Sequence, residues 1–133
     1  MKYVIDKDID DILQIYPEIF IFPFREEEYK KKVKKGYEIL PVKFLKDGKL
    51  IGFCFVIDKH INASLHCWIG GVLPEHRKTG AFGDFINWVI KYACENKYAH
   101  VTLNTDNNKP DIIRLLVKYG FDIFNVEETK YGD

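Results

Sequence analysis

One short segment of the sequence has the residue types that a phosphate-binding turn needs. Residues 70–83 read Gly-Gly-Val-Leu-Pro-Glu-His-Arg-Lys-Thr-Gly-Ala-Phe-Gly, between a predicted strand and a long predicted helix. A strand that runs through a glycine-containing turn into a helix presents unpaired backbone N–H groups, and the helix dipole favours an anion there. Gly80 allows close approach of a phosphate, and Arg77 and Lys78 add charge at its rim. The alternative is an ordinary helix start with two solvated bases.

The spacing of these residues does not match other common binding motifs. The Gly-Lys-Ser/Thr ending of a P-loop is missing, and the glycines do not fit a dinucleotide fingerprint. Histidines and cysteines lack the paired short spacing of zinc sites, although His66 and Cys67 are adjacent, so we expect no metal. Cys54, Cys67 and Cys94 lie in apolar stretches, which favours buried reduced thiols over disulfides.

The elements that must position this turn follow from hydrophobic periodicity and from turn residues. Asp8 or Asp10 is expected to cap the first helix, which carries apolar residues at helical spacing from Ile12 to Ile19. The predicted strands are residues 3–5, 39–45, 50–57, 63–72, 100–103 and 121–126. The other predicted helices are residues 26–35, 82–96 and 111–119. This order predicts an α/β (α+β) fold with a mixed, largely antiparallel central sheet flanked by helices.

Length and composition describe a single folded domain over residues 1–133. Twenty basic residues balance twenty acidic ones, so no overall field would draw the protein to nucleic acid or to an anionic membrane. The N-terminus lacks the pattern of a signal peptide, and no segment approaches eighteen consecutive apolar residues. We therefore expect a cytoplasmic protein with no nucleic-acid or membrane partner.

The segment from Val72 to Phe82 resembles the signature of the GNAT superfamily of N-acetyltransferases, Val-x-Pro-x-x-Arg-x-x-Gly-x-Gly/Ala before a long helix. Phe82 replaces the last small residue of that pattern, and Gly83 follows it. Residues 103–108 and 112–121 look like the family's next strand, helix and closing Leu-Gly-Phe. The resemblance extends over nearly the whole chain and is specific over residues 65–121.

This resemblance implies that the chain binds acetyl-CoA and transfers its acetyl group to a primary amine of a small molecule or protein, by direct attack in a ternary complex. The backbone around Val72 would pair with the pantetheine arm and polarise the thioester carbonyl. Amides from Lys78 to Gly83 would hold the pyrophosphate. The complete set of implied coenzyme-binding residues is Val72, Leu73, Arg77, Lys78, Thr79, Gly80, Ala81, Phe82, Gly83 and Asn108.

General acid–base catalysis would require a base for the amine and an acid for the departing thiolate. Period-two alternation predicts that His66 shares a face with Trp68 and Gly70, and His66 is the candidate base. Family members that acetylate arylalkylamines are similar in carrying histidines six and four places before the equivalent of Val72; this chain has His66 at the first position and Trp68 at the second. The alternative is a histidine packed in the sheet. Leu116 stands where relatives have a tyrosine acid; Tyr119 is the remaining candidate, with core packing as its alternative.

The acceptor pocket is expected to involve the first two helices and the aromatic loop 21–25, unless this loop simply folds onto the core. Relatives normally have one more strand after the closing one, so we expect this sheet to lack its last strand. A second subunit, forming a homodimer, would then cover the open edge. Two alternatives to an enzyme remain: a degenerate acyl-CoA-binding sensing or interaction module, suggested by Leu116 and Phe82, and a small binding domain with no coenzyme.

Overall fold

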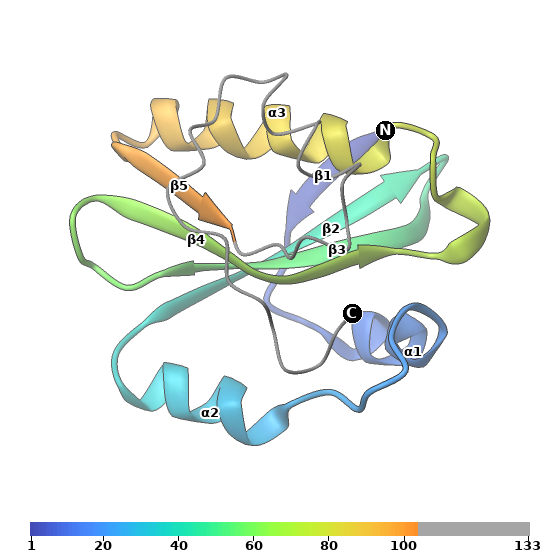
Figure 1. The fold of residues 1–133 in the computed structure, drawn as a ribbon, viewed down its shortest axis with the longest axis horizontal. Helices are drawn as coiled ribbons and strands as arrows, with labels where there is room; N and C mark the ends of the chain where they lie inside the picture. Colours follow the sequence, from blue (N-terminus) through green and yellow to red (C-terminus); the bar gives the residue numbers. More distant parts are fainter. Residues whose placement is uncertain (104–133) are drawn as a thin grey trace. The chain divides into compact units, whose positions relative to one another are not determined.

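The computed structural model describes residues 1–103, of which Met1–Thr102 form one compact unit (Figure 1). Its helices are α1 (Asp10–Ile19), α2 (Glu26–Lys34) and α3 (Ala81–Glu95), with a short 3-10 helix, η1 (Pro74–His76). Its strands are β1 (Lys2–Ile5), β2 (Glu38–Lys46), β3 (Lys49–Asp58), β4 (Ser64–Val72) and β5 (His100–Leu103). Each strand and each α-helix matches an element predicted from the sequence, and η1 was not predicted. The predicted helix 111–119 and strand 121–126 lie outside the described residues, as does the expected absence of a last strand.

The five strands form one sheet in the order β1-β2-β3-β4-β5. The first three neighbouring pairs are antiparallel. Just before β4 and β5 begin, the Ala99 N–H donates to the Ala63 carbonyl at 2.7 Å. Further along the two strands, Nδ1 of His66 in β4 lies 2.8 Å from Oγ1 of Thr102 in β5. Because these contacts advance in the same direction along both segments, β5 runs parallel to β4. The predicted mixed, largely antiparallel sheet is confirmed.

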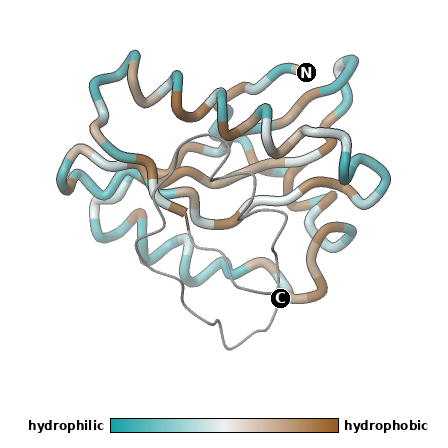
Figure 2. The backbone as a smooth tube through the Cα atoms, turned by 45° about the horizontal axis from the view of Figure 1, so that its top comes forward, coloured by the Kyte–Doolittle hydropathy of each residue, from teal (hydrophilic) through white to brown (hydrophobic). Residues whose placement is uncertain are grey.

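Helices cover both faces of the sheet. Figure 1 shows α1 and α2 on one face and α3 on the other. Alternation along β3 explains this arrangement: Phe53, Phe55 and Ile57 point to α1 and α2, whereas Cys54 and Val56 point to α3. β3 is therefore buried on both sides, and Figure 2 shows the hydrophobic colouring of the central strands.

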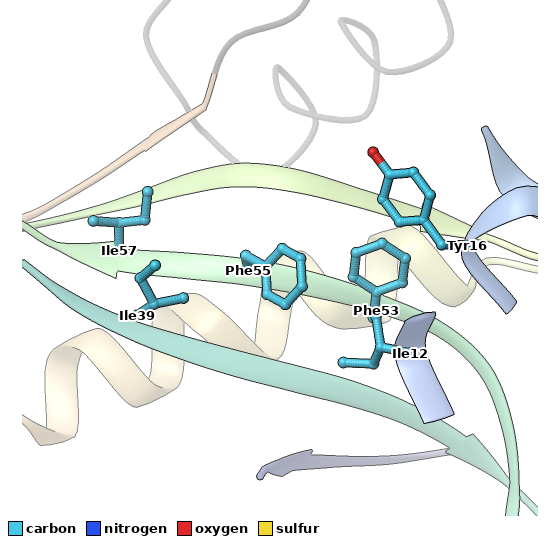
Figure 3. Close-up of a cluster of buried hydrophobic side chains, with 6 residues drawn as sticks. All are labelled: Ile12, Tyr16, Ile39, Phe53, Phe55 and Ile57. Carbon is cyan, nitrogen blue, oxygen red and sulfur yellow. The ribbon is translucent and has the colours of Figure 1, made fainter. Parts of the chain in front are cut away.

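The core beneath α1 is built mainly from aromatic rings. Ile12 and Tyr16 are one helical turn apart, so both point from α1 toward the sheet. The Tyr16 ring lies 5.9 Å from that of Phe53, and the Phe53 ring lies 5.2 Å from that of Phe55. The complete buried cluster, drawn in Figure 3, is Ile12, Tyr16, Ile39, Phe53, Phe55 and Ile57.

A buried lysine ties α1 and the segment that leads into it to the sheet. Lys43 of β2 is 6% exposed, and its Nζ lies 3.0 Å from Asp6 Oδ2 and 2.8 Å from Asp11 Oδ1. A buried ammonium group is tolerated only when it is paired, so these two carboxylates hold α1 at a defined place over the sheet.

Two details differ from the sequence-based expectations. The residue that caps α1 is Ile9, without a side-chain cap; Asp8 Oδ1 instead accepts a hydrogen bond from the Asp10 N–H at 3.1 Å. Cys54 and Cys67 are buried thiols as predicted, but Cys94 is exposed. Cys94 is exposed because Ala93 occupies the buried stripe of α3, and the next residue along a helix is turned about 100° away from it.

Replacing Phe53 with alanine should destabilise the protein strongly, because its ring is fully buried at the centre of the aromatic cluster. We expect a loss of about 3–5 kcal/mol in the free energy of unfolding, measured by urea denaturation. Val33→Ala on α2, where the side chain is exposed, is the matched control and should change stability little. A loss at Phe53 no larger than that at Val33 would contradict the assigned core.

Candidate active site

The turn between β4 and α3 has the conformation of an open anion site. The Leu73 N–H donates to the Ile51 carbonyl at 2.8 Å, which anchors the end of β4 to β3. Gly80 then caps α3 with φ of 84°, in the left-handed region that favours glycine. A Cβ added at Gly80 would meet no atom within 4 Å, so the space beside this backbone is open.

The backbone N–H groups that lead into α3 are unpaired. Within residues 1–103, none of the six amides from Lys78 to Gly83 donates a hydrogen bond, and the first N–H used is that of Asp84, to the Gly80 carbonyl at 2.9 Å. Thr79 Oγ1 donates to the His76 carbonyl at 2.6 Å and shapes the turn. Together with the N-terminal end of the α3 dipole, these donors suit a phosphate.

Arg77 holds two backbone segments together. Its Nε donates to the Val72 carbonyl and its Nη2 to the Ile19 carbonyl, both at 3.2 Å. The guanidinium group thus joins the end of β4 to the end of α1. The sequence had suggested only a charge at the rim of the phosphate site; the structure adds this bridging role, and contact between Arg77 and a phosphate stays a prediction.

A β-bulge in β4 changes which side chains share a face. Ile57 pairs with His66 and Phe55 pairs with Ile69, with a register shift between Phe55 and Val56 that leaves Trp68 as an extra residue. Beyond this point the faces are exchanged: a Cβ at Gly70 would meet Cys54 at 3.0 Å, on the α3 side. The prediction that Gly70 shares a face with His66 and Trp68 is therefore wrong, because Gly70 lies on the opposite face.

After the bulge, Gly71 takes the position that faces α1. A Cβ built there would lie 2.6 Å from Ile19 Cγ2 and 3.2 Å from the Phe20 ring. The absence of a side chain at Gly71 lets the end of α1 lie directly on β4. This close packing and the Arg77 bridge place the end of the first helix beside the end of β4, which leads into the turn before α3.

His66 is half-buried, and its Nδ1 lies 2.8 Å from Thr102 Oγ1. Burial, with smaller contributions from the positive charges of Lys59 and Lys32, lowers the pKa of His66 to about 4. The ring is therefore neutral at pH 7. In the tautomer that donates from Nδ1 to Thr102, Nε2 is left as a proton acceptor.

The end of α1 and its connection to α2 border an open hollow of about 540 Å³. Its lining is mostly apolar, and Glu26 is its charged residue. The Tyr16 hydroxyl is buried and has no hydrogen-bond partner within residues 1–103. The residues around the hollow are Leu13, Tyr16, Pro17, Phe20, Ile21, Phe22, Pro23, Phe24 and Glu26. The aromatic loop expected near the acceptor thus borders a real depression.

Sequence reasoning missed the contact between α2 and β4. The Lys32 ammonium lies 4.2 Å from the centre of the Trp68 ring, within range of a cation–π interaction. The available signal was helical spacing, since Arg25, Tyr29 and Lys32 fall on one stripe of α2.

Some predicted features cannot be placed. Asn108, Leu116 and Tyr119 lie outside the described residues, so the acid candidate remains a prediction. Over residues 1–103, no three His, Cys, Asp or Glu side chains gather in a way that could hold a metal ion. Over the same range, no helix is long and apolar enough to cross a membrane.

A family model described as the acetyltransferase (GNAT) family matches residues 9–121, most of the chain. The chain belongs to the GNAT acetyltransferase family. This family uses acetyl-CoA as acyl donor, and the resemblance found in the turn and in the closing segment is thereby confirmed. A comparison of the sequence with curated proteins gives no match.

Solved structures of N-acetyltransferases share the fold of this GNAT chain. The ribosomal-protein-S18-alanine N-acetyltransferase from Escherichia coli superposes with a TM-score of 0.75 at 15% identity, over 93% of this chain and 79% of that one. A GNAT acetyltransferase from Elizabethkingia anophelis with acetyl-CoA bound gives 0.72 at 16%, over 93% and 77%. A spermidine N-acetyltransferase chimera from Vibrio cholerae and hSSAT gives 0.73 at 18%, over 94% and 82%.

The unusual environment of His66 in this GNAT domain can be measured by NMR titration of its imidazole ring. We expect a midpoint near pH 4, well below the ordinary value of 6.5. Because the unfolded state then binds more protons between pH 6.5 and 4, the stability that neutral His66 contributes is lost as the pH falls through this window. Lys59→Gln should raise the midpoint, whereas Lys49→Gln, at the β2–β3 turn, should not. A wild-type midpoint near 6.5 would refute the assignment.

Proposed function

We propose that this chain transfers the acetyl group of acetyl-CoA to a primary amine of a small molecule or protein, by direct attack of the amine within a ternary complex. The observation that carries the proposal is the row of unpaired amides from Lys78 to Gly83, beside open space at Gly80. An ordinary helix cap would satisfy some of these donors with a side chain, and Gly80 provides none.

The end of β4 suits the arm of the coenzyme. In an antiparallel pair, successive residues direct their N–H and C=O groups to opposite sides. Since the Leu73 N–H bonds to β3, the backbone groups of Val72 point away from β3. The Val72 carbonyl is taken by Arg77, which leaves its N–H as the donor for the pantetheine arm or the thioester oxygen.

The acetyl thioester supplies the activated acyl group, whose carbon–sulfur bond breaks as the amine nitrogen forms the amide. The residues of this chain bind, orient and move a proton. His66 would accept the amine proton at Nε2, directly or through one water, in the tautomer whose Nδ1–H donates to Thr102 Oγ1. The amine would enter from the α1–α2 hollow, because Phe20 both lines this hollow and packs beside Gly71.

One observation favours a second candidate function, an acyl-CoA-binding sensing module without turnover. A histidine whose pKa is about 4 is a weak proton acceptor at pH 7. Such a module would bind the coenzyme through the same amides and release no thiol. Binding and turnover must therefore be measured separately.

Calorimetric titration should show that the wild-type protein binds acetyl-CoA and that Gly80→Trp does not bind it normally. We expect a loss of at least about 30-fold in affinity, because hydrogen bonds to a charged group are each worth roughly 1.5–3 kcal/mol. Gly48→Trp is a matched control: Gly48 also has a positive φ and open space, but lies in the β2–β3 turn. Equal affinity for acetyl-CoA in both variants would contradict the proposal that the turn at Gly80 binds the phosphates.

Free-thiol release from acetyl-CoA should depend on an added amine, in a panel of monoamines, amino acids, polyamines and peptides. His66→Ala should lower the rate about 100-fold or more, as expected for a general base, and leave coenzyme affinity unchanged. His60→Ala, an exposed histidine near the end of β3, is the control. Coenzyme binding without amine-dependent release would support the sensing module, and full activity in His66→Ala would return His66 to a packing role.

A further inference from the structure

The inner stripe of α2 carries charge where an amphipathic helix normally carries apolar side chains. None of the nine residues of α2 is buried, and Figure 2 shows its hydrophilic colouring. Tyr29 packs on Phe55, with ring centres 5.5 Å apart. One turn later, Lys32 lies over Trp68 of β4 at 4.2 Å. An ammonium group thus covers the bulge of β4.

A second ammonium group lies near the first. Lys59 directly follows β3, whose Asp58 and Ile57 pair with Leu65 and His66 of β4. Its Nζ is 5.8 Å from the centre of the Tyr37 ring. The charge of Lys59 acts on the pKa values of both Lys32 and His66, and the charge of Lys32 also acts on that of His66. The charges of both lysines therefore reach the histidine.

Neither lysine has a carboxylate partner within residues 1–103. The acid closest in sequence to Lys59 is Asp58, which accepts hydrogen bonds from the Tyr98 hydroxyl at 2.5 Å and the His60 N–H at 2.7 Å. Glu28 lies one helical turn before Lys32 but forms no ion pair with it. By contrast, Lys43 on β2 has two carboxylates. Lys32 is partly covered and also lies within reach of the charge of Glu28, whereas Lys59 is exposed. Two cations near a neutral imidazole create a local positive potential that an anion would relieve.

We infer that Lys32 and Lys59 form an anion subsite beside His66, and that the acceptor is an amine that also carries a carboxylate. This inference rests on the proposed function, because it assigns the acceptor of that reaction. A polyamine fits poorly: the two ammonium groups repel it, and the hollow offers one carboxylate, Glu26. The acceptor class thus differs from that of the spermidine N-acetyltransferase chimera that shares the fold.

The subsite also links acceptor binding to proton transfer. A carboxylate between Lys32 and Lys59 would cancel the charges that help to lower the pKa of His66. His66 would then become a stronger proton acceptor when the acceptor is bound. This coupling would offset the part of the shift that the two lysines cause, while the larger part, which comes from burial, would remain.

The test follows the His66 ring by NMR in the full chain saturated with acetyl-CoA, during titration with matched probes. Phenylalanine and 2-phenylethylamine share a ring and an amine and differ by one carboxylate. The tripeptide amides Glu-Ala-Ala and Gln-Ala-Ala differ in the same way at a side chain. We expect the carboxylate member of at least one pair to bind about fivefold more tightly, the scale of one or two partly exposed ion pairs, and to raise the His66 pKa. The responding pair distinguishes an amino acid from an acidic peptide.

Lys32→Gln and Lys59→Gln should each reduce this preference and together abolish it, whereas Lys34→Gln, exposed on the same helix, should keep it. The inference is overturned if the preference survives in the double variant, if spermidine or the probes without the carboxylate bind as tightly, or if no probe shifts His66 at millimolar concentration. Calorimetry on the same samples separates the two claims. If the protein binds acetyl-CoA normally but shows no preference for the probes with a carboxylate, the subsite alone is contradicted. If it does not bind acetyl-CoA, the proposed function is contradicted.

Discussion

The register shift between β3 and β4 is the constraint on which the rest of the site depends. Strand alternation would send Gly70 to the face of His66, and the single extra residue at Trp68 reverses this. As a result Gly71, rather than a residue with a side chain, meets the end of α1. Without the bulge, α1 could not lie so close to β4, and the hollow would be separated from the coenzyme turn.

Arg77 makes this arrangement rigid. A guanidinium group offers several donors in a fixed plane, so one side chain can bond two carbonyls that belong to different elements. Its bonds to Val72 and Ile19 connect the strand that would hold the coenzyme with the helix that borders the acceptor hollow.

Electrostatics divides the site into two regions with different tasks. The turn at Gly80 gathers unpaired amides, which attract a phosphate through fixed dipoles. The face of β4 beneath α2 gathers whole charges, from Lys32 and Lys59, around a histidine that they help to keep neutral. In the proposed function, fixed dipoles would hold a coenzyme shared by the whole family, whereas side-chain charges would select the acceptor, because side chains can change without altering the backbone.

The sequence by itself determined the elements within residues 2–103, the open turn at Gly80 and the family, because each depends on residues that are close together in the chain. Hydrophobic period, a hairpin turn and a glycine before a helix are local patterns. Only the tertiary structure decided the face of Gly70, the partners of Arg77, the exposure of Cys94 and the meeting of Lys32 with Trp68. These features depend on register and on packing between distant segments, and a shift of one residue in a strand changes them without changing any local pattern.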